Sequence, residues 1–251
     1  MQIPHNYQPE SELLRDKIIL VTGASDGIGC TAAKSFAAHG ATVILLGRTL
    51  PKLENVYDEI EAAGYPQPAI YPMNLETALE KDFFAMYEVL EKEFGRLDGV
   101  LHNASALGQR TPIASYSADE WQKVMQVNVT APFLMTKALL PLLDQAPQAA
   151  ILFTGSTVGL KGRAFWGAYA ASKAATENLM QTLADELHET TRIRVNSINP
   201  GATRTKMRAS AYPAENPASV KSAEALMPTY LYLLSDDSIG VSGQQFSYIG
   251  E

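Results

Sequence analysis

Short apolar runs alternate with longer segments of helical periodicity through most of this chain of 251 residues. The short runs are almost wholly apolar, a pattern typical of strands that are covered by other elements on both faces. Strands that alternate with helices are joined by long crossovers, and such connections favour a parallel sheet. We therefore predict an α/β fold over residues 1–251: a single domain with a doubly wound parallel sheet and helices on both faces.

The predicted strands are 17–22, 41–46, 69–73, 97–103, 149–153 and 192–198, with a short last strand near 244–248. The predicted helices lie near 28–40, 51–63, 75–94, 118–143, 166–189 and 223–234. Residues 203–222 break this alternation, because they are rich in Ala, Ser and Pro. We expect this segment to be a loop or lid that covers a substrate site and governs substrate choice.

Charge and composition exclude several classes of function. A formal net charge of −7 argues against a nucleic acid or an anionic membrane as partner, since both require a basic face. The single cysteine, Cys30, excludes an intrachain disulfide and offers no metal-ligand cluster, so we predict no metal site. The first 17 residues lack the apolar core of a signal peptide, and no apolar run is long enough to cross a bilayer. We expect a cytoplasmic protein.

A glycine-rich turn follows the first predicted strand: Thr22-Gly23-Ala24-Ser25-Asp26-Gly27-Ile28-Gly29. Glycines at a strand-to-helix turn permit positive φ and let backbone N–H groups approach a pyrophosphate at the helix N-terminus. The spacing departs from the general G-x-G-x-x-G pattern, and a glycine turn by itself is also compatible with a merely tight turn. Its position after the first strand favours a Rossmann-type dinucleotide site.

This spacing, T-G-x-x-x-G-x-G, resembles that of the short-chain dehydrogenase/reductase family, and further motifs follow in the family's order. They are His102-Asn103-Ala104-Ser105, Asn128 in Val127-Asn128-Val129, Ser156, Tyr169-Ala170-Ala171-Ser172-Lys173, Asn199-Pro200-Gly201 and Thr205. Within the family, Trp166–Tyr169 and Thr203–Ala209 resemble a poorly characterised branch of bacterial oxidoreductases. The resemblance implies a subunit that forms a homodimer or homotetramer.

Tyr169 and Lys173 are four residues apart, so on a helix their side chains share one face. An ammonium beside a phenol stabilises the phenolate and lowers its pKa from about 10 toward the range of a general acid–base. By resemblance, Tyr169 exchanges a proton with a carbonyl or alcohol oxygen, and Lys173 also binds the nicotinamide ribose. Ser156 orients the substrate oxygen, and Asn128 holds a water that relays protons from Lys173. Alone, such a Tyr/Lys pair more commonly means packing beside a solvated charge.

The resemblance also implies a set of cofactor-binding residues: Gly23, Ser25, Asp26, Gly27, Ile28, Gly29, Arg48, Asn74, Leu75, Asn103, Tyr169, Lys173, Pro200, Gly201, Thr203 and Thr205. The second predicted strand is followed by Gly47 and Arg48, where NAD-preferring sites place a carboxylate. A guanidinium pairs well with a phosphate dianion, so we predict NADP(H) in preference to NAD(H). Asp26 opposes this prediction, because NADP-preferring relatives often carry a basic residue there.

Three residues depart from the family pattern. Asn74 stands where an Asp often contacts the adenine amine, and an amide oxygen can still accept that hydrogen bond. Ser105 replaces the last glycine of N-N-A-G, which is strained only if the position requires positive φ. His102 replaces the first Asn of that motif, and we interpret it as a structural residue.

We therefore predict an NADP(H)-dependent oxidoreductase that acts on CH–OH groups of a small carbonyl or alcohol substrate. Leu107, Trp166 and Met207 suggest a moderately hydrophobic pocket, whereas Arg163, Lys206 and Arg208 leave an anionic substrate open. One alternative is a regulatory or interaction protein that uses the nucleotide structurally; the four residues Asn128, Ser156, Tyr169 and Lys173 argue against it. Another is a non-redox reaction of the epimerase or dehydratase type on the same scaffold.

Overall fold

The computed structural model describes residues 7–248 and contains one parallel sheet of seven strands in the order β3-β2-β1-β4-β5-β6-β7. The strands are β1 (Ile18–Thr22), β2 (Thr42–Gly47), β3 (Ala69–Pro72), β4 (Gly99–His102), β5 (Ala149–Thr154), β6 (Ile193–Asn199) and β7 (Gln245–Ser247). Every neighbouring pair is parallel. The predicted Rossmann-type fold class is confirmed.

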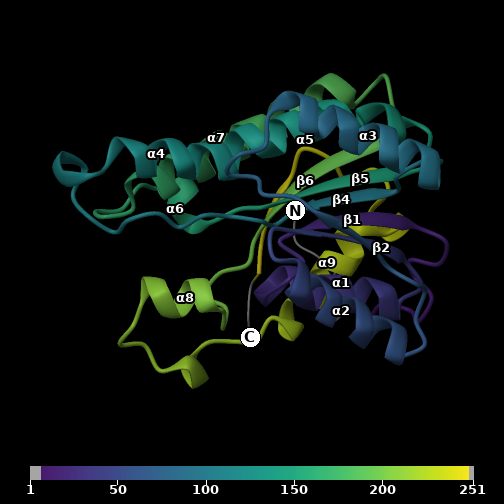
Figure 1. The fold of residues 1–251 in the computed structure, drawn as a ribbon, viewed down its shortest axis with the longest axis horizontal. Coiled ribbons are helices and arrows are strands. Elements are labelled where there is room, and N and C mark those ends of the chain that lie inside the picture. Colours follow the sequence, from purple (N-terminus) through teal and green to yellow (C-terminus); the bar gives the residue numbers. More distant parts are fainter. Residues whose placement is uncertain (1–6, 249–251) are drawn as a thin grey trace.

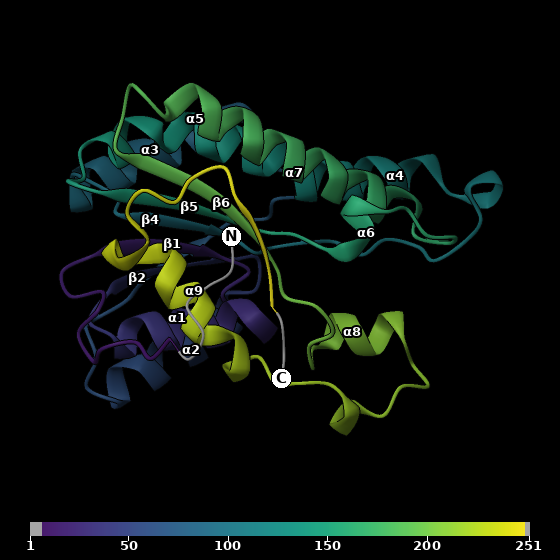
Figure 2. The same cartoon turned by 180° about the vertical axis from the view of Figure 1, so that it is seen from behind.

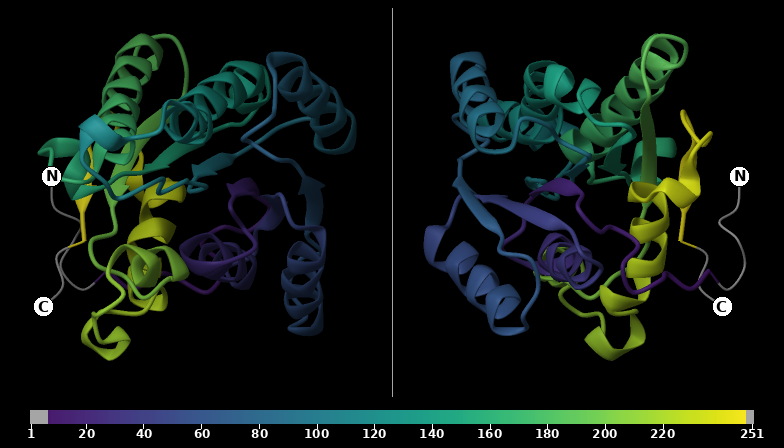
Figure 3. Two further views of the ribbon diagram at one scale, coloured as in Figure 1. Left: turned by 60° about the vertical axis from the view of Figure 1, so that its left-hand side comes forward. Right: turned by 90° about the vertical axis from the view of Figure 1, so that its right-hand side faces the viewer.

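Helices cover both faces of this sheet (Figures 1 and 2). They are α1 (Gly27–Ala38), α2 (Leu50–Ala62), α3 (Glu80–Phe94), α4 (Ala118–Met125), α5 (Ala131–Asp144), α6 (Thr157–Leu160), α7 (Gly167–Leu187), α8 (Lys206–Ala211) and α9 (Met227–Leu234). Short 3-10 turns occur at Ile113–Ser115, Pro217–Ser219, Glu224–Leu226 and Asp236–Ser238, and a π-helical turn at Gln126–Thr130. Helices α1, α2 and α9 lie on one face and α3, α5 and α7 on the other (Figure 3).

Strands β1 and β2 are almost wholly apolar because each contributes to a hydrophobic core on both sides. Val21 and Leu45 pack with α1, α2 and α9, whereas their neighbours Leu20 and Ile44 pack with α3 and α5. All four side chains are fully buried. Burial of each such side chain is worth about 1.5–3 kcal/mol, so this two-sided core fixes the strand register.

The sheet order reverses direction between β1 and β4, because β2 and β3 lie to one side of β1 and all later strands to the other. In open α/β sheets, ligands bind beyond the carboxyl ends of the strands at such a point. The turn that follows β1 and the loop that follows β4 meet there. Helix α8 stands apart from both helical layers in Figures 1 and 2.

Two of the long predicted helices differ from the prediction for local reasons. The predicted helix 75–94 begins only at Glu80, because Asn74 Oδ1 accepts from the N–H of Glu76 and the Asn74 carbonyl accepts from Thr77 and Ala78. These bonds hold 74–78 in a turn. The predicted helix 118–143 is interrupted by the π-helical turn. Among residues 7–248, no helix is both long and apolar enough to cross a membrane.

Candidate functional site

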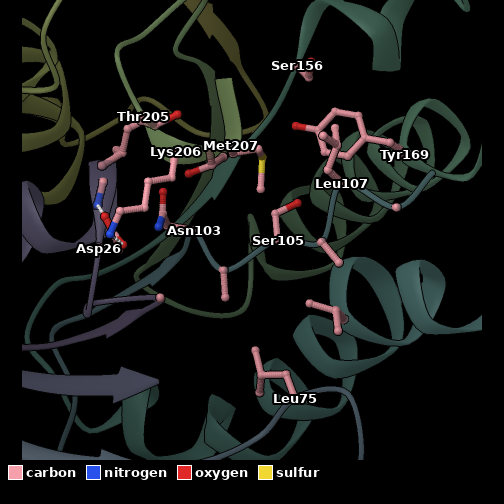
Figure 4. A pocket seen from close by; sticks show the side chains of 18 of the residues that line it. Asp26, Leu75, Asn103, Ser105, Leu107, Ser156, Tyr169, Thr205, Lys206 and Met207 are labelled. Carbon is pink, nitrogen blue, oxygen red and sulfur yellow. Dashed lines mark hydrogen bonds and ion pairs between the residues drawn. The ribbon is translucent and has the colours of Figure 1, made fainter. Parts of the chain in front are cut away.

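A cavity of about 740 Å³ opens at the carboxyl edge of the sheet (Figure 4). It is lined by the turn after β1, the ends of β2, β4, β5 and β6, the start of α7 and the 203–222 segment. The predicted residues that line it are Gly23, Ser25, Asp26, Gly27, Ile28, Arg48, Asn74, Leu75, Asn103, Ser156, Tyr169, Lys173, Pro200, Gly201, Thr203 and Thr205. Gly29 and Asn128 lie behind its wall rather than in it.

The glycine turn has the geometry of an anion site. Gly23 and Gly27 have φ values of 70° and 54°, which side chains rarely adopt, and Asp26 caps α1 through the N–H of Gly27 at 2.9 Å. Gly29 is buried, and a Cβ there would meet the carbonyl of Gly23 and the side chain of Asn103 at distances that no real Cβ tolerates. The turn thus packs tightly while the N-terminus of α1 faces the cavity. These residues fit a dinucleotide pyrophosphate.

Basic side chains surround Asp26 at the rim of the same site. Its carboxylate lies 2.6 Å from Lys206 Nζ and 3.6 Å from Lys52 Nζ. The hydrogen bond from Lys206 is the main reason why its pKa lies below the ordinary value. Exposed Arg48 lines the same cavity, so three cations lie along this part of its wall together with Asp26. Lys52 was missed by sequence reasoning, although it lies four residues after Arg48 on the next helix.

Tyr169 and Lys173 lie on successive turns of α7, as their spacing predicts. The Lys173 ammonium donates to the carbonyl of Thr154 at 2.8 Å and lies 5.6 Å from the centroid of the Tyr169 ring. Only 4% of Lys173 is exposed, and this burial lowers its pKa to about 8, with Glu177 acting in the opposite direction.

Tyr169 is half-buried, and burial raises the pKa of its phenol. Hydrogen bonding with Ser156 and Ser105 acts in the opposite direction. We expected Lys173 to lower the pKa of Tyr169. The pKa is instead raised, because removal of the phenol from water has the largest effect. In Figure 4, Ser105, Ser156 and Tyr169 border the same space.

Ser105 is a site residue that sequence reasoning treated only as a departure from the family pattern. Its φ lies outside the left-handed region, so serine costs no backbone strain there. The hydroxyl donates to Asn128 Oδ1 at 3.1 Å and lines the cavity. The replacement of glycine adds a hydroxyl beside Tyr169.

Asn128 anchors the loop after β4. Its amide donates to the carbonyl of Ala106 and to Ser172 Oγ, both at 2.9 Å, and its oxygen accepts from the N–H of Ala106 at 2.7 Å. The main-chain carbonyl of Asn128 accepts from Thr176 Oγ1 at 3.2 Å. The π-helical turn presents this side chain to the loop, and the loop in turn lines the cavity.

The 203–222 segment forms one wall of the cavity through Met207, Arg208 and Tyr212. It is organised by local contacts: Arg208 pairs with Glu215 at 2.6 Å and stacks on the Tyr212 ring at 3.8 Å. The Tyr212 ring lies 5.9 Å from that of Trp166.

The predicted hydrophobic residues Leu107, Trp166 and Met207 all line the cavity, and Tyr212, which we did not predict, joins them. Of the three predicted basic residues, Lys206 and Arg208 reach the cavity, but each is engaged by a carboxylate. Arg163 is exposed and does not line it.

His102 lies below the site and is structural. Its ring stacks on Phe153 at 4.7 Å and bonds to Thr136 Oγ1, and burial lowers its pKa to about 3. The imidazole is therefore neutral at physiological pH. Cys30, on α1, is partly buried and packs against the core.

Comparison with known proteins identifies the family. Residues 17–216 match the family model described as short chain dehydrogenase. The chain is 51% identical to the uncharacterized oxidoreductase YciK of Escherichia coli strain K12, over 96% of this chain and 95% of that protein.

Two solved structures of similar chains contain the cofactor. A short chain dehydrogenase from Shigella flexneri 2a, complexed with NADP, is 50% identical and superposes with a TM-score of 0.92, covering 95% of this chain and 99% of that one. Another from Escherichia coli CFT073, complexed with NADPH, is 51% identical with a TM-score of 0.93 and the same coverage. The chain therefore belongs to the short-chain dehydrogenase/reductase family and is an oxidoreductase similar to bacterial YciK.

Proposed function

We propose that this oxidoreductase transfers hydride between NADP(H) and the carbonyl or CH–OH group of a small organic substrate, with Tyr169 as general acid–base. The observation that carries the proposal is the position of Tyr169 on the cavity wall, with hydroxyls of Ser156 and Ser105 beside its phenol and Lys173 one turn away. NADP(H) supplies the hydride. The residues of the chain hold the substrate oxygen and move its proton.

In the direction of reduction, Tyr169 starts protonated and donates its proton to the substrate oxygen. A pKa raised by burial keeps the phenol protonated at neutral pH. The phenolate that remains is stabilised by the Lys173 ammonium, which is buried beneath it and therefore interacts with it more strongly than it would in water. Ser156 orients the substrate oxygen, and Asn128 holds the loop that forms the opposite wall through its hydrogen bonds to Ala106. In the direction of oxidation, the phenolate removes the alcohol proton.

The cofactor lies, in this proposal, along the predicted residues that line the cavity, with its pyrophosphate at the glycine turn. The 2′-phosphate faces the rim formed by Arg48 and Lys52. Asp26 is no obstacle to this phosphate, because its carboxylate is engaged by Lys206 and Lys52. These charges support a preference for NADP(H) over NAD(H).

Replacing Arg48 and Lys52 together with alanine is expected to weaken NADPH binding by about 10–100-fold, since each charged hydrogen bond to the phosphate contributes about 1.5–3 kcal/mol and is partly screened. Binding of NADH, which lacks the phosphate, changes by less than about twofold. Fluorescence titration measures both dissociation constants. Lys92→Ala, on exposed α3, is the control and should alter neither. Equal loss of affinity for NADPH and NADH would refute the proposal that Arg48 and Lys52 select NADP(H).

The substrate binds against Leu107, Trp166, Met207 and Tyr212, with residues 203–222 as its lid. Because Lys206 and Arg208 are engaged by carboxylates, a neutral substrate fits this wall better than an anionic one. The continuous seven-stranded sheet supports a single domain that both binds the cofactor and carries the catalytic residues.

A panel of neutral and carboxylated aldehydes and ketones, followed by NADPH absorbance, tests the proposal. Neutral apolar carbonyls are expected to be reduced, with carboxylated analogues slower. Tight NADPH binding without consumption of NADPH on any member would favour the regulatory alternative. Conversion of a substrate without net consumption of NADPH would favour an epimerase or dehydratase.

A further inference from the structure

A second ionisable group lies behind the proposed proton-transfer pair. Glu177 follows Lys173 by one turn of α7, and only 5% of it is exposed. Its Oε2 accepts a hydrogen bond from Ser197 Oγ on β6 at 2.6 Å. Its Oε1 is enclosed and has no hydrogen-bond donor among residues 7–248. A buried carboxylate with one oxygen unsatisfied is costly, so its retention calls for an electrostatic partner.

The backbone beside the site is shaped around this carboxylate. A Cβ at Gly155 would collide with Glu177 Oε1, so only glycine lets the carboxylate lie against the segment that leads to Ser156. The N–H of Gly155 is already bonded to the carbonyl of Ile198. Glu177 therefore contacts the wall of the cavity from behind.

Among the described groups that surround Lys173, Glu177 is the one that carries a negative charge. On α7, Tyr169 precedes Lys173 and Glu177 follows it. Strand β5 presents the Thr154 carbonyl and α6 presents Gly159, neither of which titrates. Tyr230 lies on the other side of β5, and burial raises the pKa of its phenol, so it is uncharged at neutral pH. His102 bonds to Thr136 on α5, and burial lowers the pKa of its imidazole, so it is also uncharged.

We propose that Glu177 is a positioning residue that holds Lys173 in its charged form against Tyr169, and that it acts only through Lys173. The inference rests on the proposed function, in which the Lys173 ammonium stabilises the phenolate. The three side chains then form a line along α7: phenol, ammonium and carboxylate. Substrate and cofactor meet the phenol and the ammonium, while the carboxylate stays in the core.

The consequence is a defined pH dependence. With its pKa at about 8, Lys173 is about nine-tenths charged at pH 7. Loss of the negative charge at Glu177 removes the influence that raises this pKa, so the pKa of Lys173 falls. Nearby opposite charges shift a pKa by about one unit or more. The charged fraction is then almost unchanged at pH 6 but is lower by about tenfold at pH 9.

Glu177→Gln tests this, because it keeps the shape and can still bond to Ser197. The pKa of Lys173 is measured by NMR in protein labelled with ¹³Cε-lysine and bound to NADPH, and the Lys173 signal is assigned by its absence in Lys173→Met. In Glu177→Gln this pKa should be lower than in the parent by about one unit. Glu177→Asp keeps the charge and should leave that pKa within a few tenths of the parent value. With any substrate found, the Gln variant should match the parent at pH 6 and turn over about tenfold more slowly at pH 9.

An unchanged Lys173 titration, or a loss of activity equal at both pH values, would overturn the proposal and leave Glu177 with a packing role. If the Gln variant does not fold, Glu177→Asp serves, because it keeps the charge. A Lys173 pKa that falls by about one unit in the folded Asp variant would also overturn the proposal. A shifted lysine titration without turnover of any carbonyl would defeat the proposed function while the charge coupling stands.

Discussion

Phenylalanine in place of Tyr169 is expected to lower kcat for carbonyl reduction by about 10²–10⁴-fold, the usual contribution of a positioned general acid. The ring remains, so packing against Trp166 is preserved, but the proton donor is lost. Binding of NADPH should change by less than about twofold, because the ring that lines the cavity is kept and only the hydroxyl is lost. Steady-state kinetics and a fluorescence titration of NADPH measure the two effects.

Tyr212→Phe is the matched control, because Tyr212 also lines the cavity and also packs on Trp166. It should retain kcat within about threefold, as expected for a residue that contributes only surface to the pocket. Turnover by the Tyr169 variant within about tenfold of the parent would show that another group supplies the proton.

Alanine in place of Gly29 is expected to disrupt the cofactor turn. The added Cβ collides with the backbone of Gly23 and the side chain of Asn103, so the turn must open. Overpacking of this kind costs about 1–3 kcal/mol, which lowers Tm by about 3–10 °C in a domain of this size. Because the turn lines the cavity, NADPH affinity should fall by more than about tenfold.

Gly162→Ala is the control for this substitution, since a Cβ at Gly162 meets no atom within 4 Å and its φ is not positive. It should leave both Tm and NADPH affinity unchanged. Thermal unfolding followed by circular dichroism, together with calorimetric titration, separates the loss of stability from the loss of binding. A Gly29 variant that binds NADPH as well as the parent would show that the turn does not hold the cofactor.

Much of the fold was predictable because its signals are local. Strands β1 and β2 are apolar on both faces, and such strands are stable only where other elements cover both faces of the sheet. The spacing of Tyr169 and Lys173 was sufficient to place them on one helical face. The glycine turn was predictable for the same reason, since positive φ at Gly23 and Gly27 is a property of the residue type.

Other features depend on contacts between distant residues, which single-sequence patterns do not carry. The π-helical turn presents Asn128 to the backbone of Ala106, 22 residues away, and that contact has no local signal in the sequence. The role of Ser105 was hidden because its partner Asn128 lies on another element. The direction of the Tyr169 shift depends on how deeply the phenol is buried, which spacing along a helix does not reveal.

The segment 203–222 was expected as a loop because its composition is poor in apolar periodicity. It nevertheless forms α8, a helix of only 6 residues, whose Thr205 caps the N–H of Arg208 at 3.1 Å. The pair between Arg208 and Glu215 then folds the following residues back on the helix. A cap and an ion pair of this kind are too short-range and too common in sequence to be recognised in advance.

Transfer of deuterium from NADPH that carries deuterium at both C4 positions of the nicotinamide tests the central claim most directly. The parent protein, incubated with the carbonyl panel, should yield an alcohol that carries one deuterium at the former carbonyl carbon, detected by mass spectrometry. Tyr169→Phe should reduce the rate of that incorporation by at least about 100-fold without weakening NADPH binding. Product without the label, or labelled product formed equally fast by the Tyr169 variant, would contradict hydride transfer with Tyr169 as the acid.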